Sequence, residues 1–240
     1  MRKILAWSLC VLLVLPSGAW AAIAIDAASG NTKASGAGTS ITVSHTATGT
    51  GTDGLLLAFC DLNTGGGTDF SGMTWNGSAL TQLQTHLDSS TTRVSIWYKK
   101  APAAGTFNMV ATATNDLNTT CHVLTLTGVD QTTTFGTAVT GNSTNSVPSV
   151  TVTTASGELV VDIVGWNVSA GTAAGANQTQ RDIARTVGST TSSISTQAGV
   201  DGGVMSWVQN GTAGWVQIAV PVKAAASATT CARALMGVGC

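Results

Sequence analysis

The acidic residues that could do chemistry in this chain are few and far apart. Glu158 is the only glutamate, and Asp162 follows it four residues later. On a strand the two would share a face, about 13 Å apart at roughly 3.3 Å per residue. Glycoside hydrolysis places its two carboxyl groups about 5–10 Å apart. Unless a neighbouring strand brings a partner, we therefore expect a solvated Glu158 and an Asp162 packed against a polar group.

The histidines do not single out a catalytic centre either. His45, His86 and His122 each lie in or beside a threonine-rich candidate strand. A Ser–His–Asp triad can be drawn on paper in any Ser/Thr-rich chain, so the residue types alone carry little weight. The chain has no Gly-x-Ser-x-Gly sequence, and no Lys-Ser/Thr follows Gly65–Gly67, as a phosphate-binding loop requires. We expect no catalytic residue, and an enzyme is unsupported.

Tryptophans are the better functional candidates. Trp75 precedes the Asn76-Gly77 turn, and Trp207 and Trp215 flank Asn210-Gly211. An exposed indole can stack on the apolar face of a sugar ring. We therefore take Trp75 and Trp207 as candidate ligand-binding residues. The alternative is that they lie in the core, which we favour for most of the tryptophans and most strongly for Trp97, Trp166 and Trp215.

Metals and cofactors have little support. No two Cys or His residues fall at the close spacing of a structural zinc site. Aspartates near predicted loops could supply oxygen ligands to a structural calcium ion, but no Asp-x-Asp spacing supports one; they are Asp53, Asp61, Asp69, Asp130 and Asp201. We expect no other cofactor.

The first 21 residues are typical of a secretory signal peptide. Arg2 and Lys3 precede an apolar run from Ile4 to Leu15, and Ala19-Trp20-Ala21 fits a cleavage site. The run is too short for a membrane span, which needs roughly 20 residues. Without Arg2 and Lys3 the mature chain has 8 Lys and Arg against 11 Asp and Glu, a formal charge of −3. We expect a secreted, extracellular or periplasmic protein with no membrane span.

The same charge balance excludes one class of partner. No basic run occurs anywhere in the chain, and nucleic-acid binding needs positive charge to meet the phosphates. We therefore expect no nucleic-acid partner.

Four cysteines remain after the signal, at positions 60, 121, 231 and 240. An exported chain meets an oxidising compartment, and four cysteines allow three pairings. The simplest pairing joins Cys60 to Cys121 and Cys231 to Cys240. Free buried thiols are the alternative for the first pair, and a cross-link from Cys240 to a partner is the alternative for the second.

Strand patterns fill the rest of the chain. About a dozen short alternating or apolar segments, separated by Gly- and Asn-rich turns, predict an all-β, two-sheet antiparallel β-sandwich of jelly-roll type. Residues 55–62 should form a central strand buried on both faces. The polar segment 131–149 should cross from one sheet to the other. The halves before and after Thr127 show no convincing repeat, so we expect one sandwich domain at 22–223 and a linker and Cys-containing tail at 224–240.

Six segments carry a resemblance to a known family. They are TVSHTATGTGTDGLLLAF, MTWNGSALTQL, RVSIWYKKAPAAGTFNMVAT, TGVDQTTTFGT, SVTVTTASGELVVDIVGW and AGWVQIAVPVKA. Together they resemble a recurrent β-sandwich domain of exported bacterial proteins, over roughly residues 22–224. The resemblance implies export and an all-β sandwich. That family has no settled biochemical activity, so it implies no catalytic residues.

These observations favour a non-enzymatic, secreted or cell-surface binding or adhesion module whose partner is a glycan or a cell-surface polymer. The alternative is a structural subunit of an extracellular or virion-like assembly. An extracellular hydrolase is the third hypothesis.

Overall fold

The computed structural model describes residues 22–49, 51–63, 68–88, 91–169 and 171–226. These residues form eighteen strands and no helix, which confirms the expected all-β class. Every strand pair is antiparallel. In this part of the chain no helical segment could span a membrane. The predicted signal peptide, Cys231 and Cys240 lie outside the described residues.

The first half of the chain forms one complete sandwich. Its inner sheet has the order β1 (Ala24–Lys33), β9 (Thr119–Thr127), β3 (Leu55–Asn63), β7 (Thr92–Lys100) and β6 (Thr81–Leu87). Its outer sheet has the order β2 (Ser40–Ala47), β8 (Gly105–Ala113), β4 (Phe70–Trp75) and β5 (Ser78–Ala79). Consecutive strands alternate between the two sheets at its start and end, as they do in a jelly roll.

The second half forms another sandwich. Its inner sheet has the order β10 (Val139–Ser143), β18 (Trp215–Val222), β12 (Leu159–Trp166), β16 (Thr190–Ala198) and β14 (Thr179–Gln180), with β15 (Arg185–Val187) also paired to β16. Its outer sheet has the order β11 (Ser149–Val152), β17 (Gly203–Gln209) and β13 (Thr172–Ala174).

The two sandwiches repeat one topology. The inner order β1-β9-β3-β7 corresponds to β10-β18-β12-β16, and the outer order β2-β8-β4 corresponds to β11-β17-β13. Our expectation that the halves do not repeat was wrong. The repeat is hidden because equivalent positions carry unlike side chains. Counted from the first residues of β3 and β12, for example, Cys60 corresponds to Val164 and Asp61 to Gly165.

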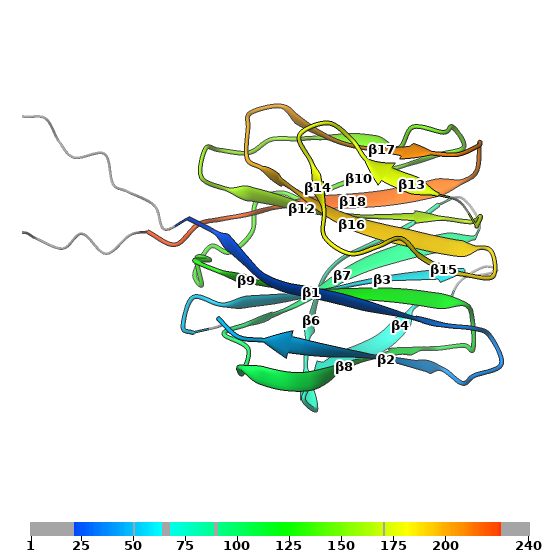
Figure 1. The fold of residues 1–240 in the computed structure, drawn as a ribbon, viewed down its shortest axis with the longest axis horizontal. Helices are drawn as coiled ribbons and strands as arrows, with labels where there is room; N and C mark the ends of the chain where they lie inside the picture. The colour runs from blue at the N-terminus through cyan, green and yellow to red at the C-terminus, as the bar shows by residue number, and fades with distance from the viewer. Residues whose placement is uncertain (1–21, 50, 64–67, 89–90, 170, 227–240) are drawn as a thin grey trace, which may run out of the picture.

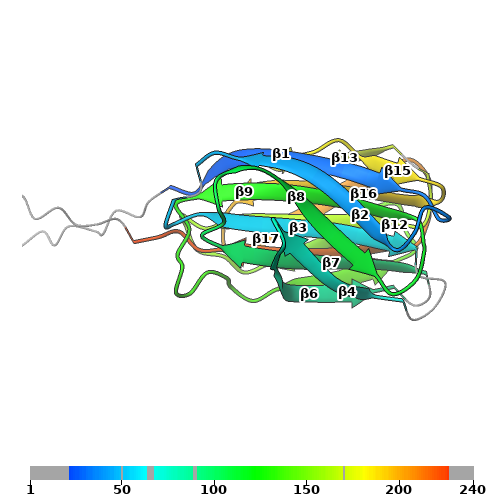
Figure 2. The same cartoon turned by 90° about the horizontal axis from the view of Figure 1, so that it is seen from below.

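The four sheets stack as four layers (Figure 1), and the view from below shows their strands overlying one another (Figure 2). The two inner sheets pack face to face through a shared apolar core. The expected sandwich architecture is therefore present twice, with four sheets instead of two. Strand β3 is buried on both faces, as predicted. Its Leu55, Leu57 and Phe59 pack against the second sandwich, whereas Leu56, Ala58 and Cys60 pack against its own outer sheet.

The polar segment 131–149 has a different role from the one we expected. It begins soon after β9, the last strand of the first sandwich, and contains β10, the first strand of the second. It therefore connects two sandwiches instead of crossing between the sheets of one. Its length reflects the passage from one repeat to the next.

The two Asn-Gly pairs also differ. Asn76 and Gly77 have φ values of 48° and 74° and join β4 to β5 in a hairpin, as a type I′ turn requires. Asn210-Gly211 makes no hairpin. It instead leads from β17 in the outer sheet to β18 in the inner sheet, because the two strands pair with different partners.

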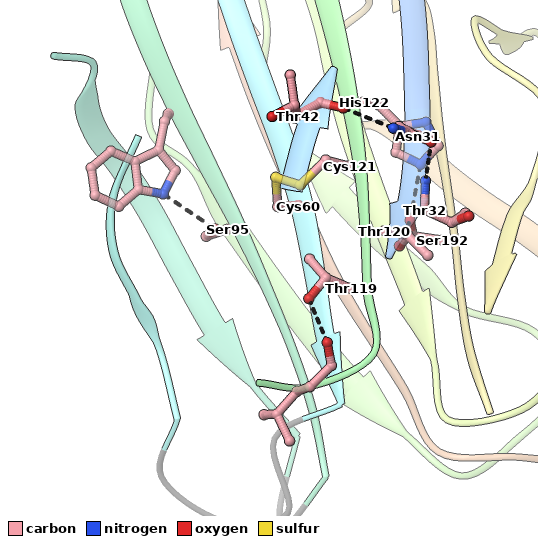
Figure 3. The surroundings of a disulfide bond; sticks show 12 residues. Asn31, Thr32, Thr42, Cys60, Ser95, Thr119, Thr120, Cys121, His122 and Ser192 are labelled. Carbon is pink, nitrogen blue, oxygen red and sulfur yellow. Dashed lines mark hydrogen bonds between the residues drawn. A yellow bond between two sulfur atoms is a disulfide. The ribbon is translucent and has the colours of Figure 1, made fainter. Parts of the chain in front are cut away.

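The predicted disulfide between Cys60 and Cys121 is present (Figure 3). The two residues lie directly opposite each other on β3 and β9, with their Cα atoms 4.2 Å apart. The bridge closes a 61-residue separation within the first sandwich. The second sandwich has Val164 and Gln217 at the equivalent positions, so no disulfide joins its β12 and β18 there.

Candidate functional site

The two tryptophans expected to bind a ligand lie in the core. Trp75 is 1% exposed and Trp207 is 0% exposed, so neither offers an indole face to a sugar. Trp75 contacts His45 and Phe107 edge-on. Trp97, Trp166 and Trp215 are buried as well. All five tryptophans are therefore core residues.

Asp162 lies at the centre of a buried hydrogen-bond network in the second sandwich. One carboxylate oxygen accepts hydrogen bonds from the backbone N–H and the hydroxyl of Ser195, at 3.0 and 2.6 Å. The other accepts from Trp207 Nε1 at 2.7 Å and from Gln217 Nε2 at 2.8 Å. Burial raises the pKa of Asp162 to about 6, against the lowering effect of these donors. The expected polar packing of Asp162 is confirmed.

Glu158 does not join Asp162 but lines a small cavity of about 180 Å³ with Asp130 and Lys223. Glu158 Oε2 accepts a hydrogen bond from the N–H of Ala155. Both Asp130 oxygens accept hydrogen bonds from Thr132 and Thr133, which lower its pKa. A general acid needs a raised pKa, which Asp130 does not have.

The structure brings together three residues that the sequence left apart. His122 Nδ1 lies 2.8 Å from Asp182 Oδ2, and His122 Nε2 lies 2.9 Å from Ser192 Oγ. These are the contacts of a Ser–His–Asp triad. Arg185 binds both Asp182 oxygens, and Ser192 Oγ also contacts the Thr120 hydroxyl at 2.5 Å. No local motif marks the set, because sequence separations of 60 and 70 residues divide His122 from its two partners.

The histidine and the serine of this triad-like set are sealed inside the protein. His122 and Ser192 are both 0% exposed. Gly30 of β1 packs so closely on the set that a Cβ there would lie 2.1 Å from Asp182 Oδ2. A substrate cannot reach Ser192 Oγ in this arrangement. Since His122 belongs to β9 and Ser192 to β16, the set joins the two sandwiches to each other.

The other two histidines have separate surroundings. His45 is buried between Ser29 and Thr125, at 2.9 and 3.1 Å from their hydroxyls. His86 Nε2 lies 3.1 Å from Asn142 Oδ1. Neither has a carboxylate within hydrogen-bonding distance among the described residues.

The aspartates considered for calcium are dispersed. Asp53 accepts from the N–H of Gly128, and Asp69 pairs with Arg93. Among the described residues there is no group of three or more His, Cys, Asp or Glu side chains that could hold a metal ion. Asp61 differs from the others because it is on a strand and is 0% exposed.

A shallow depression lies on the outer face of the β2-β8-β4-β5 sheet. Alternation along β2 and β8 sends Ile41, Val43 and Met109 inward and leaves serines, threonines and asparagines outward. The depression has a volume of about 430 Å³ and is lined by Ser44, Thr74, Asn76, Gly77, Thr106, Phe107, Asn108 and Val110. None of these side chains is ionisable.

The polar groups of this depression are available to a ligand. Ser44 and Asn108 lie opposite each other on β2 and β8, and both are exposed. Within the described part of the chain, the side chains of Ser44, Asn76 and Asn108 make no hydrogen bond, whereas Thr46 and Thr106 share one at 2.8 Å. Val110 and Phe107 are partly exposed beside them. The surface therefore offers neutral donors and acceptors next to a small apolar area.

We compared the chain with protein-family models, curated proteins and solved structures, and found no match. The resemblance to exported bacterial β-sandwich domains stays a prediction.

Proposed function

We propose that this protein is an exported, non-enzymatic binding module that holds a neutral carbohydrate on the outer face of the β2-β8-β4-β5 sheet. The observation that carries the proposal is the uncharged depression around Ser44 and Asn108. Sugar hydroxyls both donate and accept hydrogen bonds, and Ser, Thr and Asn side chains can answer both. Val110 and Phe107 supply apolar contact for the C–H groups of a sugar ring.

The charge of the site selects the kind of glycan. The depression contains no Lys or Arg to pair with sulfate or carboxylate groups. An anionic polymer would gain no ion pair there, so neutral glycans are the expected ligands.

An array of neutral and sulfated glycans tests the proposal. The wild-type protein should bind members of the neutral set, and Asn108→Ala should weaken that binding about tenfold, the effect of one or two lost hydrogen bonds. Thr151→Ala, at an exposed position on the outer sheet of the second sandwich, is the matched control and should bind like wild type. Absence of binding to every neutral glycan would refute the proposal.

A second candidate function, a subunit of an extracellular assembly, rests on the outer sheet of the second sandwich. Val204 and Val208 of β17 are 46% and 54% exposed, and Val147, just before β11, is 53% exposed. Exposed apolar side chains gathered on one face are typical of protein contact surfaces. Size-exclusion chromatography of the wild type and of Val208→Glu tests this role. A concentration-independent monomer for the wild type would exclude it.

A further inference from the structure

One end of the interface between the two inner sheets is polar and built symmetrically from the two repeats. Asn63 Nδ2 donates to Ser189 Oγ at 2.8 Å, and the equivalent Asn167 Nδ2 donates to Thr91 Oγ1 at 3.0 Å. The two asparagines also contact each other, with Asn63 Nδ2 3.2 Å from Asn167 Oδ1. These four residues, the asparagine bridge, join the sandwiches at this end.

Unpartnered oxygen atoms lie next to the asparagine bridge. Both carboxyl oxygens of Asp61 and the hydroxyls of Thr92 and Thr190 are buried without a hydrogen-bond partner. Thr92 pairs with Asn63 in the β3–β7 ladder, two residues beyond Asp61. Thr190 follows Ser189 of the bridge.

The three side chains aim into the same interface. Asp61 shares a face of β3 with Leu57 and Phe59, which pack against the second sandwich. Thr92 shares a face of β7 with Val94 and Ile96. Thr190 shares a face of β16 with Ile194, which packs back against the first sandwich. Buried polar groups without a partner are costly, and a buried carboxylate is the most costly of them.

A second carboxylate increases the negative charge here. Asp88 Oδ1 accepts a hydrogen bond from the N–H of Thr92 at 2.9 Å. Burial, and then the charge of Asp88, raise the pKa of Asp61 well above its usual range. Among the described residues no Lys or Arg forms an ion pair with Asp61.

We propose that this end of the interface binds a hard cation of the calcium type, with Asp61 as its carboxylate ligand and Thr92 and Thr190 as hydroxyl ligands. The available donor atoms are all oxygens, which hard cations prefer and which softer metals do not. A bound cation would satisfy the four unpartnered oxygens together and offset the charge of Asp61. Because its ligands come from both repeats, it would also hold the two sandwiches together.

The test uses the whole protein, stripped with a chelator and titrated with Ca²⁺, and separately with Tb³⁺. Trp166 directly follows Gly165, which packs against the Asp61 carboxyl group across the interface. Trp166 should therefore sensitise Tb³⁺ luminescence. We expect a saturable signal and a Tm that rises with Ca²⁺. In both measurements Asp61→Asn should weaken ion binding about tenfold or more, since it removes the only carboxylate ligand. Asp201→Asn, in an exposed turn, is the control and should behave like wild type.

The opposing account is that Asp61 is simply a buried neutral acid. It predicts a Tm independent of Ca²⁺, no sensitised luminescence, and an Asp61→Asn variant at least as stable as wild type in both chelator and Ca²⁺. That outcome would overturn the cation site. A Ca²⁺ effect that Asp61→Asn leaves unchanged would overturn it as well. Neither result bears on carbohydrate binding, whose residues lie on the outer sheet.

Discussion

Asp61 and Gly165 occupy equivalent positions in the two sandwiches, and they contact each other across the interface between them. A Cβ atom on Gly165 would lie 2.8 Å from Asp61 Cγ and 2.7 Å from Val94 Cγ1. The buried carboxyl group of the first repeat therefore occupies the space left by a missing side chain in the second. This complementarity shows that two repeats with one topology fit each other through unlike residues at equivalent positions.

Gly165→Ala should destabilise the protein by about 1–3 kcal/mol, because a methyl group would overpack the interface. Gly72→Ala is the matched control, since a Cβ at that strand position meets no atom within 4 Å. Urea unfolding of both variants measures the difference. Equal stabilities for the two variants would show that the interface accommodates the added methyl group with no loss of stability.

Asp61→Asn should change how stability depends on pH in the presence of a chelator. The folded-state pKa of Asp61 is raised, so its favourable contribution is complete below the unfolded pKa of about 3.9 and is lost as pH rises. The variant lacks this loss. It should therefore gain stability over wild type as pH rises from about 4 to 7, measured by urea unfolding at each pH. A constant difference between the two proteins would contradict the raised pKa.

Two buried tryptophans allow the Asp162 network to be measured. Trp207 and Trp166 are both 0% exposed and contact each other edge-on. Trp207 Nε1 donates to Asp162, whereas Trp166 Nε1 has no partner. Trp207→Phe should therefore cost about 1–3 kcal/mol more than Trp166→Phe, the value of a hydrogen bond to a buried charged group. Chemical denaturation gives both values, and an equal cost would mean that the network adds no stability.

His122 should make the protein less stable in mild acid. Burial lowers the pKa of His122, so below the unfolded value of about 6.5 the unfolded chain takes up a proton that the folded protein resists. His122→Asn should lose less stability than wild type between pH 7.5 and pH 5. Ser192→Ala keeps the imidazole, so it should lose about 1 kcal/mol at both pH values with the pH dependence unchanged.

Removing the disulfide by the double change Cys60→Ala and Cys121→Ala should lower the free energy of unfolding by about 4 kcal/mol through loop-closure entropy. The comparison is denaturation of the variant beside oxidised and reduced wild type. A loss below about 1 kcal/mol would indicate that the unfolded chain is already compact.

The features predicted correctly from the sequence depend on short-range patterns. The continuous apolar run Leu55–Leu62 predicts a buried strand, and the Asn76-Gly77 pair predicts a tight turn. Each prediction needs only a few adjacent residues. The Cys60–Cys121 pairing followed from the small number of cysteines. The structural repeat could not be predicted from the sequence, because the two sandwiches share a strand order and not a residue pattern. Equivalent residues such as Asp61 and Gly165 have no side-chain chemistry in common.

Sites built across the repeats were equally hidden. His122 meets Asp182 and Ser192 only because β9 packs against the second sandwich. Trp75 and Trp207 lie beside turns, but both side chains point into the core. Which face of a strand points into the core depends on how the sheets are layered, and the local sequence does not give that. The depression around Asn108 was missed because a search for aromatic platforms overlooks surfaces made of neutral polar side chains.

The most direct test of the proposed function is hydrogen–deuterium exchange of the protein with dextran, xylan and mannan, beside dextran sulfate as the charged counterpart. We expect at least one neutral polymer to slow exchange in peptides covering β2, β8 and the Asn76-Gly77 turn, with no such protection from dextran sulfate. Protection confined to the second sandwich, or equal protection by the sulfated polymer, would contradict a neutral-carbohydrate site on the β2-β8-β4-β5 sheet.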